Sequence, residues 1–371
     1  MAVYACGVAL EVKTAGESHG PALVAIVSGL PAGLLLDRDA IDHDLNRRQQ
    51  GYGRSPRQRL EQDRVEVVAG LRHGCTLGSP LALVIRNRDH ENWAWGMSPW
   101  PPEGDETGKG TTPVTLPRPG HADLAGALKY GHDDTRNTLE RASARQTAVQ
   151  VAAGAVAKAL LREIGVEVSA RVLEVGGEAS EDEWQRATDA ARADRDTLGG
   201  VIEVVAEGAP PGLGSYAEKE TRLDARLAAA LMGIQAVKGV EIGEGFALAR
   251  RRGSEAHDEV GDDRRRETNR AGGIEGGVTN GEPVVVRAAM KPLPTLMRPL
   301  RSVDLESGEP GEALVERSDV QAVEALAVVA EAAVAWELAR AAREKFGGDA
   351  LIDFLGAHAA YLERIRWRHN G

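Results

Sequence analysis

The pattern of apolar and polar positions divides the chain into short strands and a few longer helices. Apolar, β-branched runs bounded by turn residues are typical of strands. Such runs occur at residues 22–28, 65–69, 81–85, 166–175, 201–206 and 283–289. Residues 37–50, 138–164 and 320–346 are expected to be helices, and in the first and last of them the apolar side chains fall on one face. Asp37 has the residue type that caps a helix N-terminus.

This order of elements predicts a mixed α/β (α+β) fold. Strands and helices do not alternate strictly, so a doubly wound parallel sheet is not required. No linker separates two cores and no solenoid-like repeat occurs, so residues 1–371 are expected to form a single domain. Residues 98–119 and 250–268 lack a periodic pattern and are expected to be surface loops near an active site.

The composition refines this fold prediction in two ways. Of the residues, 42% are hydrophobic but only 4% are aromatic, so the core must be aliphatic. The basic residues comprise 37 Arg and 8 Lys. A coding bias towards arginine accounts for such a total, but it does not account for local clusters of a side chain that binds phosphate and carboxylate with two parallel hydrogen bonds.

The net charge limits the possible functions. A formal charge of −11 and a pI of about 5.4 argue against a general binder of nucleic acids or membrane surfaces, because such proteins need a basic face. Cys6 and Cys75 have neither disulfide-framework nor zinc-site spacing, so no metal site is expected. The apolar runs at 148–161 and 320–339 contain charged residues, and no signal-peptide pattern occurs at the start of the sequence. These observations predict a cytoplasmic protein.

Two short segments place a histidine in a glycine-containing turn. Residues 16–20 read GESHG, and residues 118–123 read RPGHAD, with His121 expected at the start of a helix. A histidine can exchange a proton near neutral pH, so both are candidates for acid–base catalysis. Asp123 could orient or charge the ring of His121. The alternatives are an ordinary turn with an exposed histidine and a structural histidine at a helix start.

Two further segments concentrate arginine. Residues 47–59 read RRQQGYGRSPRQR, and residues 141–145 read RASAR. Guanidinium groups around glycines suit a phosphate or a carboxylate, and Arg141 and Arg145 would share one helical face. For residues 47–59, the alternatives are a solvated basic loop and a nucleic-acid contact. For residues 141–145, the alternative is a partially buried structural arginine pair neutralised by acidic residues.

The C-terminal third contains a glycine-rich segment and an RSD sequence. Residues 269–295 hold AGGIEGGVTNGEP, then a predicted strand, then KPLPT, which would suit a phosphate cradle but matches neither GxxxxGK[ST] nor GxGxxG. Residues 317–319 precede the last long helix, so Ser318 or Asp319 could simply cap that helix.

Together, and in this order, these segments resemble the chorismate synthase family. The resemblance extends over about residues 8–341. It rests on GESHG, RRQxGYGR, RPGHAD, RxSAR, QAVKGVEIGEGF at 235–246, NRAGGIEGGVTNG, KPxxT and RSD.

The resemblance implies a single β-α-β layered sandwich domain that assembles as a homotetramer. It also implies the last step of the shikimate pathway: an anti 1,4-elimination that removes phosphate from C3 and a proton from C6 of 5-enolpyruvylshikimate 3-phosphate to give chorismate. Reduced FMN is required without net redox change, and the cofactor carries the difficult chemistry while the protein supplies placement and protons. The absence of a dinucleotide fingerprint predicts a monofunctional enzyme that depends on an external flavin reductase or another source of reduced flavin.

The resemblance also implies residue roles. His19 would protonate the departing phosphate, His121 would protonate reduced flavin near N1, and Asp319 would relay the C6 proton beside flavin N5. The implied ligands of the substrate phosphate and carboxylates are Ser18, Arg48, Arg54, Arg145 and Arg317. The implied flavin contacts are Arg141, Ala142, Ser143, Gln235, Ala236, Gly276, Lys291, Pro292, Leu293, Pro294, Thr295 and Arg317.

The chain departs from the family pattern at four positions. Gln146 stands where the family often has Glu, Pro294 replaces a hydroxyl residue, and Leu139 and Glu140 stand where glycines are usual. Three other functions compete with the enzyme: a flavin or phosphate carrier without catalysis, an arginine-rich nucleic-acid protein, and a flavin oxidoreductase with a nicotinamide donor. The three acid–base residues argue against the first, the low pI against the second, and the missing Rossmann fingerprint against the third.

Overall fold

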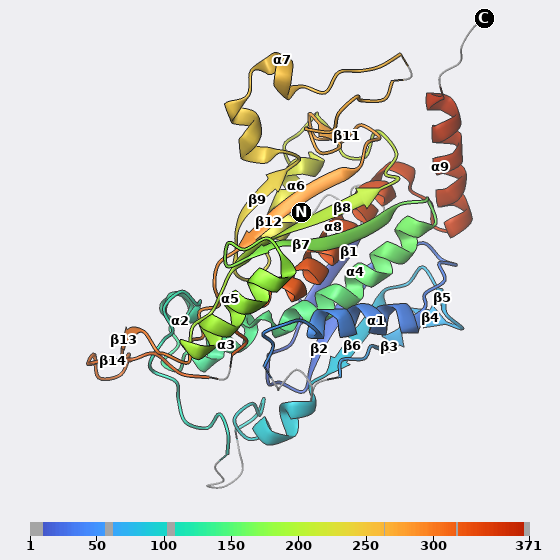
Figure 1. Cartoon of the computed structure of the whole chain (residues 1–371). Helices are drawn as coiled ribbons and strands as arrows, with labels where there is room; N and C mark the ends of the chain where they lie inside the picture. Colours follow the sequence, from blue (N-terminus) through green and yellow to red (C-terminus); the bar gives the residue numbers. More distant parts are fainter. Residues whose placement is uncertain (1–9, 56–61, 102–107, 263, 317, 367–371) are drawn as a thin grey trace, which may run out of the picture.

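The structure is a computed structural model that describes residues 10–55, 62–101, 108–262, 264–316 and 318–366. Two antiparallel four-stranded sheets enclose a layer of long helices, so that the layers follow the order β-α-β (Figure 1). This arrangement confirms the mixed α/β fold.

The first sheet is built from the N-terminal part of the chain, in the order β1-β2-β6-β3. Its strands are β1 (Glu11–Ala15), β2 (Ala22–Ser28), β3 (Glu66–Ala69) and β6 (Leu81–Arg86). In β2, Leu23, Ala25 and Val27 are fully buried while Ile26 is exposed, as the two-residue period of a strand requires. One face of this sheet therefore covers the helical layer.

The second sheet has the order β7-β8-β12-β9. Its strands are β7 (Glu167–Val175), β8 (Gly200–Glu207), β9 (Val237–Ile242) and β12 (Val284–Met290). The six strands that the sequence predicts are all present across the two sheets. The sequence did not predict β1 and β9, because their charged residues and a glycine interrupt the apolar pattern.

The helical layer contains α1 (Arg38–Gln49), α4 (Thr147–Arg162) and α8 (Val323–Phe346). Helix α4 packs on β2 and β6, α8 packs on β7 and β8, and the two helices pack on each other. A Cβ atom at Gly154 would lie 2.3 Å from that of Ala332, so this close crossing requires glycine. The buried core is mostly Leu, Val, Ile and Ala, as the composition predicts.

The helix boundaries confirm one prediction and correct two. Asp37 caps α1 by accepting a hydrogen bond from the N–H of Asp39. The single helix expected at 138–164 is wrong. Extended backbone at Ser143 (φ −61°, ψ 142°) divides it into α3 (Arg136–Ala142), the short 3₁₀ helix η3 (Ala144–Gln146) and α4. Helix α8 begins at Val323, which is later than expected.

The remaining elements are short or peripheral. They are β4 (Leu71–Arg72), β5 (Cys75–Thr76), η2 (Arg88–Trp93), α2 (Asp123–Tyr130), α5 (Glu181–Ala193), α6 (Leu223–Met232), η4 (Gly245–Arg250), α7 (Gly253–Ala256), β10 (Ile274–Glu275), β11 (Val278–Thr279), β13 (Arg301–Val303), β14 (Pro310–Glu312) and α9 (Leu351–Ile365).

Within the two predicted loops, the described part of residues 98–119 contains no helix or strand, whereas residues 250–268 include α7. In the part of the chain that the structure describes, no helix is long and apolar enough to span a membrane.

Candidate active site

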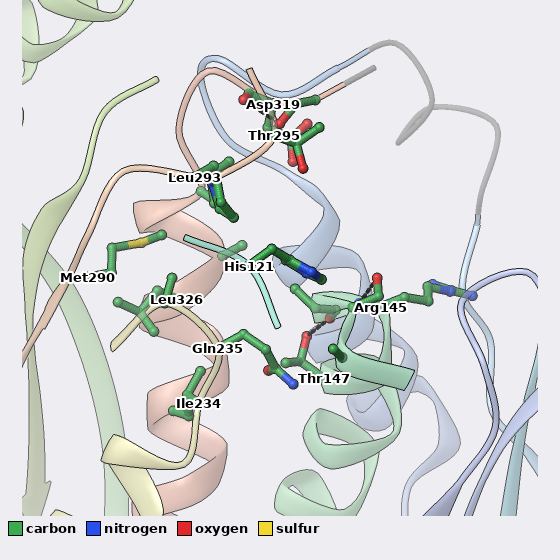
Figure 2. A pocket seen from close by; sticks show the side chains of 18 of the residues that line it. His121, Arg145, Thr147, Ile234, Gln235, Met290, Leu293, Thr295, Asp319 and Leu326 are labelled. Carbon is green, nitrogen blue, oxygen red and sulfur yellow. Dashed lines mark hydrogen bonds between the residues drawn. The ribbon is translucent and has the colours of Figure 1, made fainter. Parts of the chain in front are cut away.

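A cavity of about 470 Å³ lies at the N-terminal ends of α4 and α8. Figure 2 shows His121 between an apolar wall, which includes Met290 and Leu326, and a polar wall, which includes Arg145 and Thr147. The structure brings most of the predicted site residues to this cavity. They are Ser18, His19, Arg48, Arg54, His121, Ala142, Ser143, Arg145, Gln235, Ala236, Lys291, Leu293, Pro294, Thr295 and Asp319.

The GESHG segment forms a tight turn after β1. Gly16 has a φ of +111°, and a Cβ atom there would lie 2.4 Å from the carbonyl oxygen of Ala22, so the turn requires glycine. The amide of Asn87 donates to the carbonyl oxygens of Gly20 and Glu17 at 2.7 and 3.1 Å. His19 is only 6% exposed, so the alternative of an ordinary turn with an exposed histidine is wrong.

His19 is paired with a buried carboxylate that the sequence analysis did not assign to the site. Its Nδ1 donates to Glu140, 2.9 Å from Oε1 and 3.0 Å from Oε2, and its backbone N–H donates to Oε2 at 2.9 Å. Arg136 donates to Oε1 from the other side at 3.3 Å. Burial alone would raise the pKa of Glu140, but the hydrogen bonds from His19 and the charge of Arg136 lower it. Because Nδ1 is occupied, Nε2 is the ring nitrogen of His19 left for chemistry.

The face of the His19 ring is also held. The Trp93 ring stacks on it with centroids 4.0 Å apart and an interplanar angle of 21°, and the guanidinium of Arg136 lies 5.0 Å from the Trp93 ring. Nδ1 of His90 donates to the carbonyl oxygen of His19 at 2.9 Å. Ring, backbone and Nδ1 of His19 therefore each have a fixed partner.

His121 lies in a second group of histidine, carboxylate and arginine. Arg118 donates to Asp123 through its backbone N–H (3.0 Å), its Nε (2.8 Å) and a terminal nitrogen (3.2 Å). Nδ1 of His121 contacts Asp123 Oδ1 and also lies 3.1 Å from the Arg118 guanidinium. Burial alone would raise the pKa of Asp123, but the hydrogen bonds from His121 and Arg118 hold it well below its usual range.

The structure confirms that His121 precedes a helix, because α2 begins at Asp123. The turn is connected to the KPLPT segment by two contacts. Nζ of Lys291 donates to the carbonyl oxygen of Gly120, and Arg118 donates to Thr295 Oγ1 at 2.9 Å. His121 and this segment therefore border the cavity as one unit.

The polar wall carries two mostly buried arginines. Arg145 donates to Asp63 at 2.6 Å and to Asn87 at 2.9 Å. Arg48 donates to Thr147 at 2.8 Å, and its guanidinium lies 3.5 Å from the same Asp63 carboxylate. Both arginines line the cavity, where guanidinium groups suit the binding of an anion.

Asp319 pairs with Arg54 at the mouth of the cavity. Arg54 lies 2.8 Å from the Asp319 carboxylate, which also accepts the N–H of Ser55 at 2.6 Å. The alternative that Ser318 or Asp319 caps the long helix is wrong. Helix α8 starts at Val323, and its first N–H donates to the side chain of Gln321 at 2.7 Å.

Two features beside the apolar wall are unusual for an ordinary core. Ala236 has a φ of +69°, a left-handed conformation that costs a non-glycine residue energy and is frequent at functional sites. In the part of the chain that the structure describes, the buried Gln235 Oε1 and the buried Arg54 Nε have no hydrogen-bond partner. Buried polar atoms are normally paired, so both atoms are available to a ligand.

Some predicted site residues lie elsewhere. Arg141 donates to the carbonyl oxygens of Thr14 and Gly16, at 3.0 and 3.1 Å, and so supports the GESHG turn from outside the cavity. It does not share a helical face with Arg145, because Ser143 separates their helices. Gly276 lies in the turn between β10 and β11, and neither it nor Pro292 is among the described residues that line the cavity. Arg317 lies outside the described residues.

The RRQQGYGRSPRQR segment is divided in the same way. Arg48 and Arg54 reach the cavity, whereas Arg47 donates to Glu331 at 2.9 Å inside the helical layer. Arg57 and Arg59 lie outside the described residues. An acid-paired, partly buried role for Arg47 was not among the alternatives that the sequence analysis gave for this segment.

Sequence reasoning missed several residues of the site, namely Asp63, Asn87, Trp93, Arg118, Lys238 and Glu140. Glu140 was noted only as a departure from the family pattern. Its position four residues after Arg136 on a short, partly buried helix was the available signal, because a buried acid needs a cation or a donor beside it.

The fold and the cavity together have the features of an enzyme that uses acid–base chemistry on a small anionic molecule. Two histidines, each with a buried carboxylate, border the same cavity as Arg48 and Arg145. In the described part of the chain, no group of His, Cys, Asp and Glu residues could hold a metal ion.

The comparisons with known proteins identify the family. A family model for chorismate synthase matches residues 10–342. The chorismate synthases of Desulforudis audaxviator and Rubrobacter xylanophilus are 55% and 54% identical, and their alignments cover 98% and 95% of this chain and 100% and 96% of the relatives. A crystal structure of chorismate synthase superposes with a TM-score of 0.77 at 37% identity, covering 97% of this chain and 99% of that one. The chain belongs to the chorismate synthase family, whose members are lyases.

Proposed function

We propose that the chain catalyses the anti 1,4-elimination of phosphate from 5-enolpyruvylshikimate 3-phosphate, with reduced FMN as its cofactor and chorismate as its product. One observation carries the proposal: His19 and His121, each paired with a carboxylate, border the same cavity as Arg48 and Arg145. A phosphorylated dicarboxylate needs such cations for binding, and its elimination needs a proton donor and a proton acceptor.

The residues in and beside the apolar wall fit a flavin. The unpaired Gln235 Oε1 can accept an N–H of the flavin ring, and the unpaired Arg54 Nε can donate to an anion. Ile234, Met290 and Leu326 offer an apolar surface for the ring, and Lys291 adds a cation. When bound, reduced FMN would supply an electron-rich ring that lends an electron to the substrate and recovers it.

The chain's own side chains would then divide the work. Ser18, Arg48 and Arg145 bind the phosphate and carboxylates, and the apolar wall excludes water from the reacting bonds. His19 donates the proton on Nε2 to the departing phosphate. Asp319 accepts the proton released from C6. His121 exchanges a proton at the cavity side through Nε2, because Asp123 occupies Nδ1 and so orients the ring.

The same proposal includes the oligomeric state, the location of the protein and the source of its reduced flavin. We expect a homotetramer in the cytoplasm that receives reduced flavin from an external reductase. Light scattering on the purified chain, whose mass is 39.4 kDa, should report four copies. Oxidised FMN with a nicotinamide donor and no added reductase should give no turnover.

The deciding experiment is an anaerobic assay with chemically reduced FMN and 5-enolpyruvylshikimate 3-phosphate, in which chorismate is followed by its absorbance. We expect turnover with reduced FMN and none with oxidised FMN in air. A matched control is 5-enolpyruvylshikimate without its phosphate, which lacks the leaving group. Failure of the purified, folded protein to make chorismate under these conditions would refute the proposal.

A further inference from the structure

We propose that Glu140 is a positioning residue for His19: it holds the ring in one orientation, with the Nδ1 proton on the carboxylate side and Nε2 directed at the cavity, so that His19 can give up a proton there. The inference rests on the proposed function, because it explains how His19 becomes the acid for the departing phosphate. Glu140 acts through His19 and does not itself need to touch the substrate.

The geometry leaves the His19 ring little freedom. Both oxygens of Glu140 lie within 3.0 Å of Nδ1, and one of them also accepts the backbone N–H of His19 at 2.9 Å. Rotation of the ring would break the contact at Nδ1 and the stacking on Trp93. An ionised carboxylate can only accept hydrogen bonds. The contact with Glu140 therefore requires a proton on Nδ1 of His19, whether the ring is neutral or charged.

The backbone of Glu140 joins the same turn. Its carbonyl oxygen accepts the N–H of Ser18 at 3.1 Å, so the main chain and the side chain of one residue bind two consecutive residues of GESHG. Helix α3, which carries Glu140, is thereby fixed against the turn. Small movements of His19 relative to Glu140 are restricted on both sides of the hydrogen bond.

The charged side chains near the pair make Glu140 a shared partner. Those on the neighbouring elements include Glu17 in the turn, Asp89 and His90 on η2, Arg136 and Arg141 on α3, and Arg48, Arg145 and Asp63 on the polar wall. Arg136 and His19 both donate to Glu140, and these contacts lower the pKa of the carboxyl group, so it accepts from both as an anion. Among the described residues, Glu140 is the carboxylate in contact with His19, whereas Asp63 contacts Arg48 and Arg145.

Two substitutions separate charge from shape. Glu140→Gln keeps the size of the side chain but removes the charge, and Glu140→Asp keeps the charge but shortens the reach. With saturating reduced FMN at pH 7, we expect Glu140→Gln to lower kcat at least about tenfold while KM changes less than about threefold, because His19 as a general acid contributes about a hundredfold or more. Glu140→Asp should recover part of that loss.

The split between kcat and KM is a readout that a purely structural role would not give, because general damage to the site would impair substrate binding as well as turnover. Glu203→Gln is the matched control, since Glu203 is a buried acid paired with Arg171 and Arg287 outside the cavity.

Nitrogen-15 NMR of the histidine rings tests the same idea without any turnover. The His19 signal is identified by its loss in His19→Gln. In the wild-type protein, we expect the neutral ring to carry its proton on Nδ1. In Glu140→Gln we expect both neutral tautomers, because an amide can either accept a hydrogen bond from Nδ1 or donate one to it. This measurement in wild type remains decisive even if Glu140→Gln does not fold.

The outcomes are distinct. A neutral His19 protonated on Nε2 in wild type, or the same tautomer, kcat and KM in Glu140→Gln as in wild type, would overturn the role of Glu140. A wild-type protein that makes no chorismate would instead refute the proposed function, and the NMR result would still decide whether Glu140 controls His19.

Discussion

The two histidines of the cavity have the same three-membered arrangement but differ in what surrounds Nδ1. Arg136, Glu140 and His19 form one group, and Arg118, Asp123 and His121 form the other. In each, an arginine lies behind a buried carboxylate that contacts the ring. In both groups a buried carboxylate thus holds the ring through Nδ1.

The difference lies in the arginine. Arg136 contacts Glu140 and stays away from the ring nitrogen, whereas Arg118 lies 3.1 Å from Nδ1 of His121. The ionised Asp123 carboxylate can only accept at its contact with Nδ1, so the neutral His121 ring also carries its proton there, although Arg118 brings a second donor close to the same nitrogen. At His19, Glu140 is the described partner of Nδ1. The two rings therefore share one proton position, and among the described residues only His121 has an arginine directly beside Nδ1.

The largest expected effects come from removing either ring. His19→Ala and His121→Ala should each lower kcat by about two to four orders of magnitude, the usual range for a general acid or base. Steady-state kinetics with reduced FMN measures this, and His43→Ala on the exposed face of α1 is the control. Near-normal turnover in one of the two variants would make that histidine structural and end the parallel between the groups.

The carboxylates should differ in their contribution to stability. Asp123→Ala leaves Arg118 buried without its main partner and should cost about 3 to 5 kcal/mol of unfolding free energy. Glu140→Ala should cost less, because Arg136 donates to Glu140 through a single nitrogen. Urea unfolding of both variants at pH 7 measures the difference, and a larger loss in Glu140→Ala would contradict it.

The same stability difference should depend on pH in a defined direction. The folded-state pKa of Asp123 is lowered, so the ionised side chain stabilises the protein above about pH 4, the unfolded value. The advantage of wild type over Asp123→Ala should therefore be constant from pH 5 to 8, in these approximate limits, and decrease as the pH falls below about 4. An advantage that grows in acid would show that the pair is not ionic.

Asp319 is a third carboxylate with an arginine partner but, in the described structure, no histidine. A substitution at Asp319 therefore tests proton transfer without changing the partner of a histidine ring. Asp319→Asn should lower kcat about a hundredfold, because an amide cannot take the proton. Binding of substrate and FMN, measured by calorimetry, should be normal or tighter, since a negative charge is lost. Unchanged turnover would contradict the catalytic role and reduce Asp319 to a partner of Arg54.

The smallest effect should come from Trp93, whose ring stacks on His19. Trp93→Leu removes the stacking on His19 and the contact with Arg136, which together are worth about 0.5 to 1.5 kcal/mol. We expect a decrease in kcat of about threefold to tenfold. Trp95→Leu, a change at an exposed tryptophan of the same segment, should have no effect. Equal losses of kcat in both variants would show that the loss comes from a general change in this segment and not from the stacking on His19.

Much of the fold could be read from the sequence because its signals are local. The strands at 22–28 and 81–85 have apolar runs that need only a buried face, and Asp37 caps α1 through the N–H two residues away. The group around His121 is also local. Its three members lie within residues 118–123, where a Pro-Gly turn and a helix start bring them together.

The tertiary structure alone decided the partners that are distant in sequence. Glu140 lies 121 residues from His19, and the sequence could present it only as a departure from a family pattern. Arg54 and Asp319 meet from opposite ends of the chain, and Arg141 turned out to support the GESHG turn and not the cavity. The physical reason is that these contacts depend on how α3 and the start of α8 pack against the N-terminal turns. That packing is driven by burial of the aliphatic core, whose energy carries no direction, so the local sequence contains no signal for which polar side chains it will bring together.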